Sequence, residues 1–398
     1  MAKLLKWLVF AVSAFVLLLV GVAVALQQWV RTDDFRSRVE REATAALGVP
    51  LTMGRLSVDL WPLPAVAVDD VRLQTRPPIS VTRVEARPVW TALLLGRLEI
   101  ATLLVRQAVL PQTALAALGA AMQKKDEAAA KPAAPGPSAS VVWPRRAVLD
   151  AVSWIDGQGR RTTMDAKAAL AGDGLLQEAS FKVVGGRFVG ARGELRREAD
   201  HWPVRVDIGG GTIRGKLQLQ PAVKGGQLLQ GQLRTENVEL AALTAPSRTL
   251  TGKLQAQTTL RAEFREVGQL GEVLRTQTRF DVRNAVLEGI DLARAVQTAG
   301  LSRGGSTRLD TLAGQVTTQG KALQLTKLVA TSGVLAASGN VAISASQALS
   351  GRLSVELQAA GAGIGVPLAV GGTLSAPSVT LTRGALGALA APGGAANA

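Results

Sequence analysis

The sequence contains no cysteine and no tyrosine, and it has a single histidine, His201. The absence of cysteine excludes disulfides, thiolate metal sites and cysteine nucleophiles. One histidine excludes a histidine-rich metal centre, while a catalytic triad built on that histidine stays open. Aromatic residues make up only 4% of the chain, so large rings contribute little to any core. An enzyme is therefore the less favoured class, and we expect neither a metal nor a cofactor.

The chain is otherwise rich in apolar residues and positive charge. Hydrophobic residues make up 47% of its 398 residues, which is enough to bury a sizeable core and excludes wholesale disorder. The 45 lysines and arginines exceed the 30 aspartates and glutamates, so the formal net charge is +15. These cations alternate along the chain instead of clustering, and few aromatic residues accompany them to stack on bases. We therefore expect no nucleic-acid partner and interpret the charge as a solvated sheet face.

Residues 7–26 form a run without a charged side chain. As a helix, this run is about 30 Å long, which is the thickness of a bilayer core. Lys3 and Lys6 precede it and favour a cytoplasmic N-terminus. A cleaved signal peptide is the alternative, because Ala23-Val24-Ala25 fits a cleavage site, but the apolar run continues through that site at full membrane length. We predict a membrane anchor over residues 1–31, with the rest of the chain outside the cytoplasm.

The remaining chain divides by composition and periodicity. Apolar residues at helical spacing, followed by Gly48, predict a helix over residues 32–48. A second short helix is expected at about residues 291–298. We predict four further regions. Residues 32–122 hold the post-anchor helix and the first strands, and residues 123–140 form an Ala/Pro-rich linker or loop, with a partner-binding tract as the less favoured interpretation. Residues 141–383 form a β-rich body, and residues 384–398 form a flexible tail.

Alternating apolar and polar residues dominate the predicted body, and glycine clusters such as Gly209–Gly211 separate the alternating segments as hairpin turns. This pattern predicts a mainly β, antiparallel structure. Each strand has one apolar face, and there are too few helices to cover all of them. The sheet must close on itself or curl into a trough that contacts an apolar ligand, and the shortage of aromatic filler favours the trough. The candidate groove lining consists of Leu56, Val58, Leu60, Leu98, Ile100, Ile213, Leu217, Leu219, Phe280, Val282, Leu353, Val355 and Leu357.

Several segments resemble one known family in chain order. Residues 35–73 and 87–104 are similar to the N-terminal signature of the AsmA family, in which a helix ends in glycine and strands with a proline-bearing turn follow. Residues 284–292, 307–312 and 366–379 are similar to later elements of that family. Residues 333–343 resemble its pair of strands, with Gly339-Asn340-Val341 expected in the turn.

The resemblance implies a fold and a function. The fold is one N-terminal transmembrane helix followed by an elongated, curled antiparallel β-sheet that forms a groove, with a few short helices. The implied protein is a single-pass protein of the bacterial inner membrane, with its bulk in the periplasm. It would bind phospholipid and conduct it between the membranes, supporting outer-membrane biogenesis. Outer-membrane or periplasmic proteins are further candidate partners. The cations nearest the predicted anchor are candidate headgroup contacts: Arg31, Arg36, Arg38 and Arg41.

Two other functions remain as hypotheses. A non-enzymatic assembly or scaffold factor for outer-membrane proteins would bind its partners at open sheet edges. An exported hydrolase would use His201, oriented by Asp200, but no nucleophile lies beside this pair in the sequence and a turn histidine is the favoured interpretation. The sequence lacks the common nucleophile, zinc and phosphate motifs, so we expect no catalytic residues.

Overall fold

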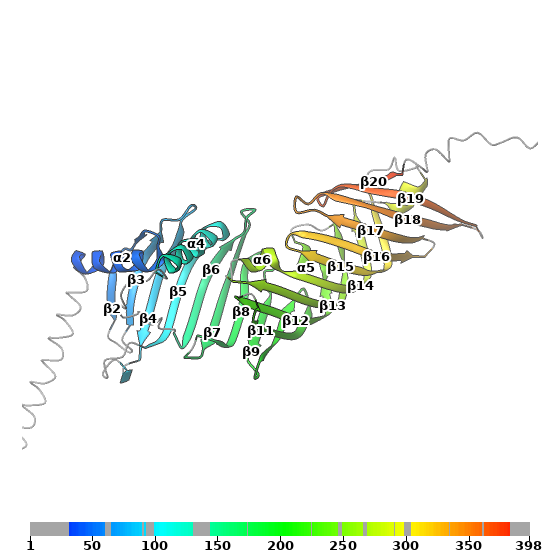
Figure 1. The fold of residues 1–398 in the computed structure, drawn as a ribbon. Coiled ribbons are helices and arrows are strands. Elements are labelled where there is room, and N and C mark those ends of the chain that lie inside the picture. Colours follow the sequence, from blue (N-terminus) through cyan, green and yellow to red (C-terminus); the bar gives the residue numbers. More distant parts are fainter. Residues whose placement is uncertain are drawn as a thin grey trace, which may run out of the picture. The chain divides into compact units, whose positions relative to one another are not determined.

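The computed structural model describes residues 32–59, 65–89, 91–92, 99–129, 144–172, 174–223, 225–245, 249–265, 269–289, 291–297, 304–333, 335–359 and 362–382 (Figure 1). The chain forms two compact units, residues 1–186 and residues 187–398. The predicted anchor, residues 7–26, lies outside the described residues. Among the helices that are described, none is long and apolar enough to cross a membrane.

Unit 1 combines helices with a sheet. Its elements are α2 Asp33–Leu47, β1 Leu51–Thr52, β2 Leu56–Asp59, β3 Ala65–Leu73, β4 Ile79–Pro88, β5 Ile100–Pro111, α4 Gln112–Ala129, β6 Arg146–Ile155, β7 Arg161–Leu170 and β8 Leu176–Gly186. The prediction of a helix over residues 32–48 is confirmed. Asp33 and Asp34 lie in the first turn of α2, where carboxylates favour the helix dipole. Gly48, at φ +69°, ends the helix and donates its N–H to the carbonyl of Thr44 at 2.9 Å.

The sheet of unit 1 departs from the expected pattern at one point. Strands β1 and β2 both pair with β3, and the pairs β3–β4, β4–β5, β6–β7 and β7–β8 are antiparallel. However, β5 and β6 are parallel. Parallel neighbours need a long crossover connection, and helix α4 lies in that connection. Because α4 continues to Ala129, residues 123–129 of the expected linker or loop are helical, and residues 130–140 lie outside the described residues.

Helices α2 and α4 cover part of the apolar surface of unit 1. Val39 of α2 packs with the buried side chains of Met53, Leu56 and Val58. Ala114 of α4 is fully buried and packs with two strand residues in a second cluster: Leu73 and Ile79. The helices therefore bury the ends of β1–β4 that lie nearest to them.

Unit 2 is a meander of strands with three short helices among its described residues. Its elements are β9 Arg192–Arg196, β10 His201–Ile208, β11 Gly211–Pro221, β12 Gln227–Glu239, α5 Leu240–Thr244, β13 Leu250–Phe264, α6 Leu270–Val273, β14 Arg275–Glu288, α7 Leu292–Gln297, β15 Ser306–Gln319, β16 Ala322–Ser332, β17 Leu335–Ile343, β18 Leu349–Ala359, β19 Ala362–Thr373 and β20 Ala376–Leu381. Helix α7 confirms the helix expected at residues 291–298.

Each strand of unit 2 pairs with the next one in the chain, and every pair is antiparallel. Within the described residues of this unit, β9 and β20 do not pair with each other, so its sheet is open. The chain is therefore mainly β, with open sheet and short helices, as predicted.

Two turn predictions had different outcomes. The hairpin expected at Gly209–Gly211 is confirmed, because Ile208 pairs with Gly211 and Gly210 has a φ of +71°. The prediction of a turn at Gly339–Val341 was wrong, because those residues lie inside strand β17. The turn instead contains Gly333, at φ +50°. The side-chain carbonyl of Asn340 accepts a hydrogen bond from the N–H of Lys327, which has a φ of +51° at an irregularity in β16.

Candidate functional site

The strand register of unit 2 places alternate residues in rows that run across one face of its sheet. The outermost continuous row crosses β10 to β18. It consists of Trp202, Leu217, Gly231, Leu260, Thr276, Thr318, Leu323, Ile343 and Leu349. We call the side of the sheet that carries this row the apolar face, and the row itself the outer row. Since neighbouring strands are about 4.8 Å apart, eight steps give the outer row a length of about 38 Å.

The predicted lining residues of unit 2 all lie on the apolar face. Leu217 belongs to the outer row, and Leu219 pairs with Leu229 one step beyond it. Further from the outer row, a second line of pairs connects Ile213, Thr235, Ala256, Phe280 and Gly314, and another connects Gly339, Leu353 and Leu368. Val282 and Val355 lie in the next row, and Leu357 pairs with Leu335. The register thus places on one face residues that are up to 142 positions apart in the chain, from Ile213 to Val355.

Part of this face is filled by the protein itself. Val282 is 1% exposed, and Val355 and Leu368 are 0% exposed. They belong to one core cluster, in which Leu292 of α7 and residues of β15–β20 also pack. Helix α7 contacts β15 and β18. We call this cluster the filled half. Val282 and Val355 were predicted to line a groove, and the structure instead buries both against the protein's own side chains.

The outer row forms a different surface on the same strands. Leu217, Leu260, Leu323, Ile343 and Leu349 are half-buried, and the core cluster does not include them. We call the part of the apolar face that carries the outer row the open half. Gly231 leaves room for the leucine side chains of the two neighbouring strands. A Cβ at this position would lie only 2.6 Å from Cδ2 of Leu217 and 3.2 Å from Cγ of Leu260. The two leucines therefore meet over Gly231 and continue the apolar surface from β11 to β13.

Threonines interrupt the leucines without making the row polar. The hydroxyls of Thr276 and Thr318 are 2.7 Å apart, and those of Thr258 and Thr278 are 2.9 Å apart. Each pair of hydroxyls satisfies hydrogen-bonding capacity that apolar surroundings would otherwise leave unmet. The predicted groove lining left these threonines out, although they occupy the apolar positions of alternating segments. The methyl groups and paired hydroxyls allow the row to remain continuous across β14 and β15.

Unit 1 carries a shorter row of the same kind. Val68, Val84, Val105, Leu149, Ala166 and Phe181 are connected by register from β3 to β8, and all six are half-buried. Sequence reasoning did not select them. Of the residues predicted in this unit, Leu56 and Val58 are buried beneath α2 and Ile100 is half-buried at the start of β5. Leu60 and Leu98 lie outside the described residues.

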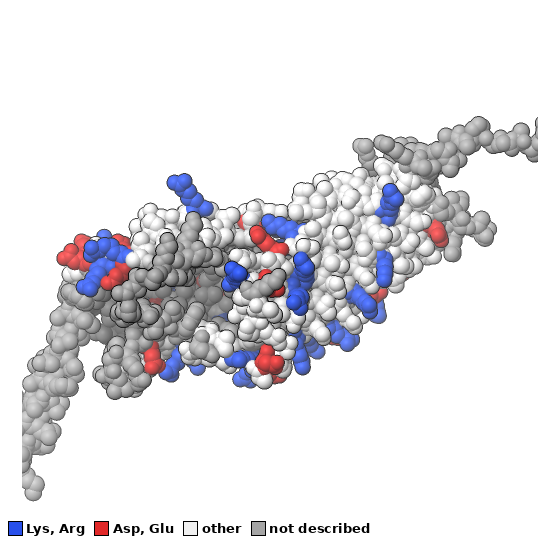
Figure 2. Space-filling model, in the orientation of Figure 1, with Lys and Arg blue, Asp and Glu red and all other residues white. Residues whose placement is uncertain are grey.

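Carboxylates lie close to two of the arginines of α2 that were predicted to contact lipid headgroups. A nitrogen of Arg36 lies 3.5 Å from Asp33, and Nε of Arg38 lies 3.5 Å from Glu42. Arg41 is exposed and donates from Nε to the carbonyl of Ser37 at 3.2 Å. Helix α2 contains four acidic residues and three arginines, and red and blue side chains intermix there in Figure 2. The helix therefore has no excess of positive charge. Arg31 lies outside the described residues.

His201 does not adopt the arrangement of a catalytic base. Its Nδ1 lies 3.3 Å from Oδ1 of Asp200, and its Nε2 lies 3.7 Å from Oε2 of Glu198. Both carboxylates are exposed, and in the described part of the chain no serine or threonine hydroxyl forms a hydrogen bond to the ring. The histidine pairs with Gln218 in the register of β10 and β11. These contacts supply an orienting carboxylate but no nucleophile.

Comparison with known proteins supports the resemblance seen in the sequence. Residues 1–148 match the model of the AsmA family. The match extends from the N-terminus into β6 of unit 1. No curated protein and no solved structure showed a significant similarity to the chain.

Proposed function

We propose that this chain, whose residues 1–148 match the AsmA family, binds phospholipid acyl chains on its apolar sheet faces and conducts them between two membranes. In this proposal, residues 7–26 anchor the protein in the bacterial inner membrane, and both units lie in the periplasm. The protein performs no chemical step and uses no cofactor. Its role is the supply of lipid for outer-membrane biogenesis.

The observation that carries the proposal is the open half of unit 2. Its leucines and isoleucine are half-buried although they lie on the same face as a fully packed core. Apolar side chains contribute about 25 cal/mol per Å² when they leave water, so a half-covered row still gains free energy when an apolar ligand covers it. An acyl chain is such a ligand.

The dimensions of the row suit lipid tails. The hydrocarbon core of a bilayer is about 30 Å thick, so one tail extends for about 15 Å. The outer row, at about 38 Å, is longer than two such tails laid end to end. Because the contacts are apolar and non-directional, neighbouring positions along the row have similar binding free energies. A lipid can therefore move from strand to strand without a large barrier, while its headgroup stays in water.

A crosslinking experiment tests the proposal. A photo-reactive amino acid is placed at Leu323 in the open half, and separately at Gln324, the exposed neighbour whose side chain lies on the other face of β16. The full chain is produced in bacterial cells, irradiated, and analysed by mass spectrometry. We expect a phospholipid adduct at position 323 and none at position 324.

Two results would contradict the proposal. Equal lipid labelling at both positions would show that the label reports only proximity to a membrane. Protein adducts in place of lipid at position 323 would favour the assembly-factor hypothesis.

A further inference from the structure

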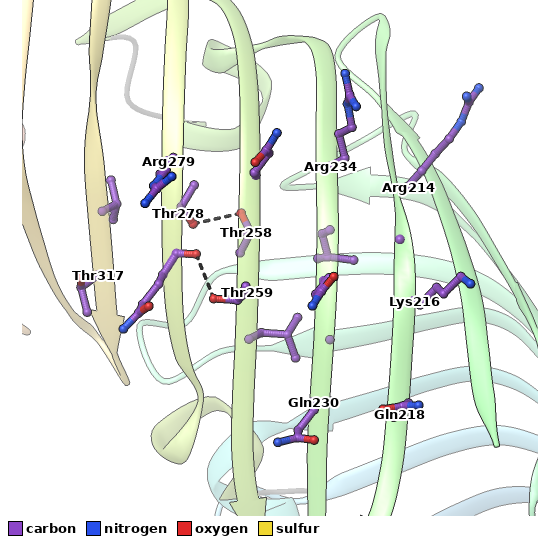
Figure 3. A pocket seen from close by; sticks show the side chains of 18 of the residues that line it. Arg214, Lys216, Gln218, Gln230, Arg234, Thr258, Thr259, Thr278, Arg279 and Thr317 are labelled. Atoms are coloured by element: carbon purple, nitrogen blue, oxygen red, sulfur yellow. Dashed lines mark hydrogen bonds between the residues drawn. The ribbon is translucent and has the colours of Figure 1, made fainter.

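The opposite face of the unit 2 sheet carries a hollow whose charged lining residues do not belong to the proposed lipid path. It has a volume of about 1190 Å³ and lies over β10–β15 (Figure 3). Arg214, Lys216, Arg234 and Arg279 line it, together with His201 and six glutamines. No aspartate, glutamate, phenylalanine or tryptophan is among the lining residues. Gly231 and Leu260 of the outer row also line the hollow, whereas Ile213, Leu217 and Phe280 of the apolar face do not.

The register aligns arginines across this polar face. Arg205 pairs with Arg214, and Arg214 pairs with Arg234 on the next strand. Arg234 pairs with Gln257, and Gln257 pairs with Arg279. Four arginines therefore occupy one line across five strands, β10 to β14. We call this line the arginine row. A nearby cross-strand pair, Arg261 and Arg275, repeats the like-charge arrangement.

The arginine row is only partly neutralised by carboxylates of the protein. Arg205 lies 3.3 Å from Asp207, and Arg234 lies 2.9 Å from Glu236. Among the described residues, no carboxylate lies within 4.0 Å of a cationic nitrogen of Arg214 or Arg279. Like charges directly opposite each other on adjacent strands destabilise a sheet. The fold thus keeps an unfavourable arrangement that a bound anion would make favourable.

The glutamines indicate what else the ligand presents. Gln232, Gln257, Gln277 and Gln315 lie between or beside the cations on neighbouring strands. A primary amide both donates and accepts hydrogen bonds, as a sugar hydroxyl requires. Nucleic acid fits less well, because the lining holds no phenylalanine or tryptophan to stack on successive bases and has His201 as its one ring. A flat membrane surface fits less well than a chain-like ligand, because the cations line a hollow.

We infer that this hollow binds an anionic polysaccharide whose phosphate, sulfate or carboxylate groups contact the arginine row and whose hydroxyls contact the glutamines. The ligand contacts the cations and glutamines of the polar face, and of the outer row only Gly231 and Leu260 border the same hollow. Binding weakens as salt is added, because the contacts are exposed and screened. The inference rests on the cations and the proposed function on the apolar row, so each can fail without the other.

The test measures binding of the purified full chain to a sulfated octasaccharide, by calorimetry at two salt concentrations. The triple variant R214Q/R234Q/R279Q removes three lining cations. The matched variant R308Q/K321Q/R352Q removes three exposed cations of the same unit that lie outside this hollow. We expect the first variant to bind roughly 100-fold more weakly and the second to bind within about threefold of the unaltered protein. A neutral dextran of equal length should not bind.

Control ligands and a folding measurement distinguish the outcomes. Circular dichroism shows whether each variant is folded. If the triple variant is unfolded, the single variant R214Q replaces it in the binding measurement and is expected to bind about fivefold more weakly than the unaltered protein. Equal losses in the two triple variants would overturn the inference, since net charge alone would then explain binding. Binding to phosphatidylglycerol vesicles but not to the octasaccharide would also overturn it and would assign the surface to a membrane.

Discussion

The filled half and the open half of unit 2 are built on the same strands from the same kinds of residue, yet only one is a core. In the filled half, Val355 and Leu368 are fully buried because they pack in one cluster with Leu292 of α7 and with side chains of β20. In the open half, Leu323 and Leu349 are only half-buried. The difference shows that an alternating strand does not determine whether its apolar side is core or surface. A second element has to cover it, and α7 is too short to reach the whole row.

The largest effect should come from a charge placed in the filled half. We expect V355D to destabilise the chain by at least about 3 kcal/mol, because the carboxylate would be buried without a partner. Its control is S354D, at the exposed neighbouring position on the same strand, which should change stability by less than about 0.5 kcal/mol. Urea unfolding followed by circular dichroism measures both. If V355D were as stable as S354D, the filled half would not be a packed core.

Truncating one leucine in each half sharpens the same comparison. L368A should lower the free energy of unfolding by about 2–5 kcal/mol, because it leaves a cavity in a close-packed site. L349A removes similar atoms from a half-buried position and should lower it by about 1 kcal/mol. Thermal unfolding of both variants gives the difference. Equal losses would mean that the two halves are packed equally well.

A charge in the open half should affect lipid rather than stability. Under the proposed function, the unaltered chain should copurify with phospholipid. We expect L217E to remain folded but to retain less than a tenth of that amount, because a carboxylate interrupts the outer row. Q220E adds the same charge on the polar face of the same strand and should retain its lipid. Mass spectrometry of lipid extracts provides the measurement. Normal lipid content in L217E would contradict the assignment of the row.

The threonine pair of the outer row should behave as an apolar unit. T276V alone leaves the hydroxyl of Thr318 without its partner and should cost about 1 kcal/mol, while T276V/T318V together should be nearly neutral. A double-mutant cycle in urea measures the coupling. Additive losses would show that the hydroxyls are solvated independently of each other.

The smallest effect concerns the polar face at low pH. Hydrogen bonds from the Arg205 guanidinium and from the Thr212 hydroxyl lower the pKa of Asp207 below its ordinary value of 3.8. The folded state therefore favours the carboxylate, and this stabilisation is complete above the unfolded pKa and disappears as the pH falls through the lower, folded pKa. D207N should remove this part of the acid sensitivity. Urea midpoints of both proteins between about pH 6 and pH 2 test the difference.

Much of the fold followed from local patterns. Helix α2 begins with two aspartates and ends at Gly48, and alternation located β11, β14 and β18 because one face of each strand is apolar. Alternation also placed Ile213, Phe280 and Leu353 on one face of the sheet. The parallel pair β5–β6 and the helical start of residues 123–140 were missed. Alanine, lysine and glutamate favour helix even in a segment whose prolines, further along, suggest a linker.

The candidate site could be predicted only in part. Val282 and Leu217 both lie in alternating apolar and polar segments, so the local pattern could not show that Val282 is buried in the core and that Leu217 is half-buried. Thr276 was not predicted to line the face because threonine is a polar residue. Its hydroxyl is satisfied by Thr318 of β15, and this pairing is visible only in the structure. The arginine row likewise required the register, because Arg214 and Arg234 are 20 residues apart and become neighbours only through the hairpin of β11 and β12.

The sequence by itself determined that the chain forms amphipathic strands with many turns, because a two-residue period is a property of each strand alone. Only the tertiary structure decided which apolar residues are covered, which threonines pair and which arginines oppose each other. Those outcomes depend on register and on the reach of short helices, which no local pattern encodes. Burial is a property of two surfaces, and a single strand specifies only one of them.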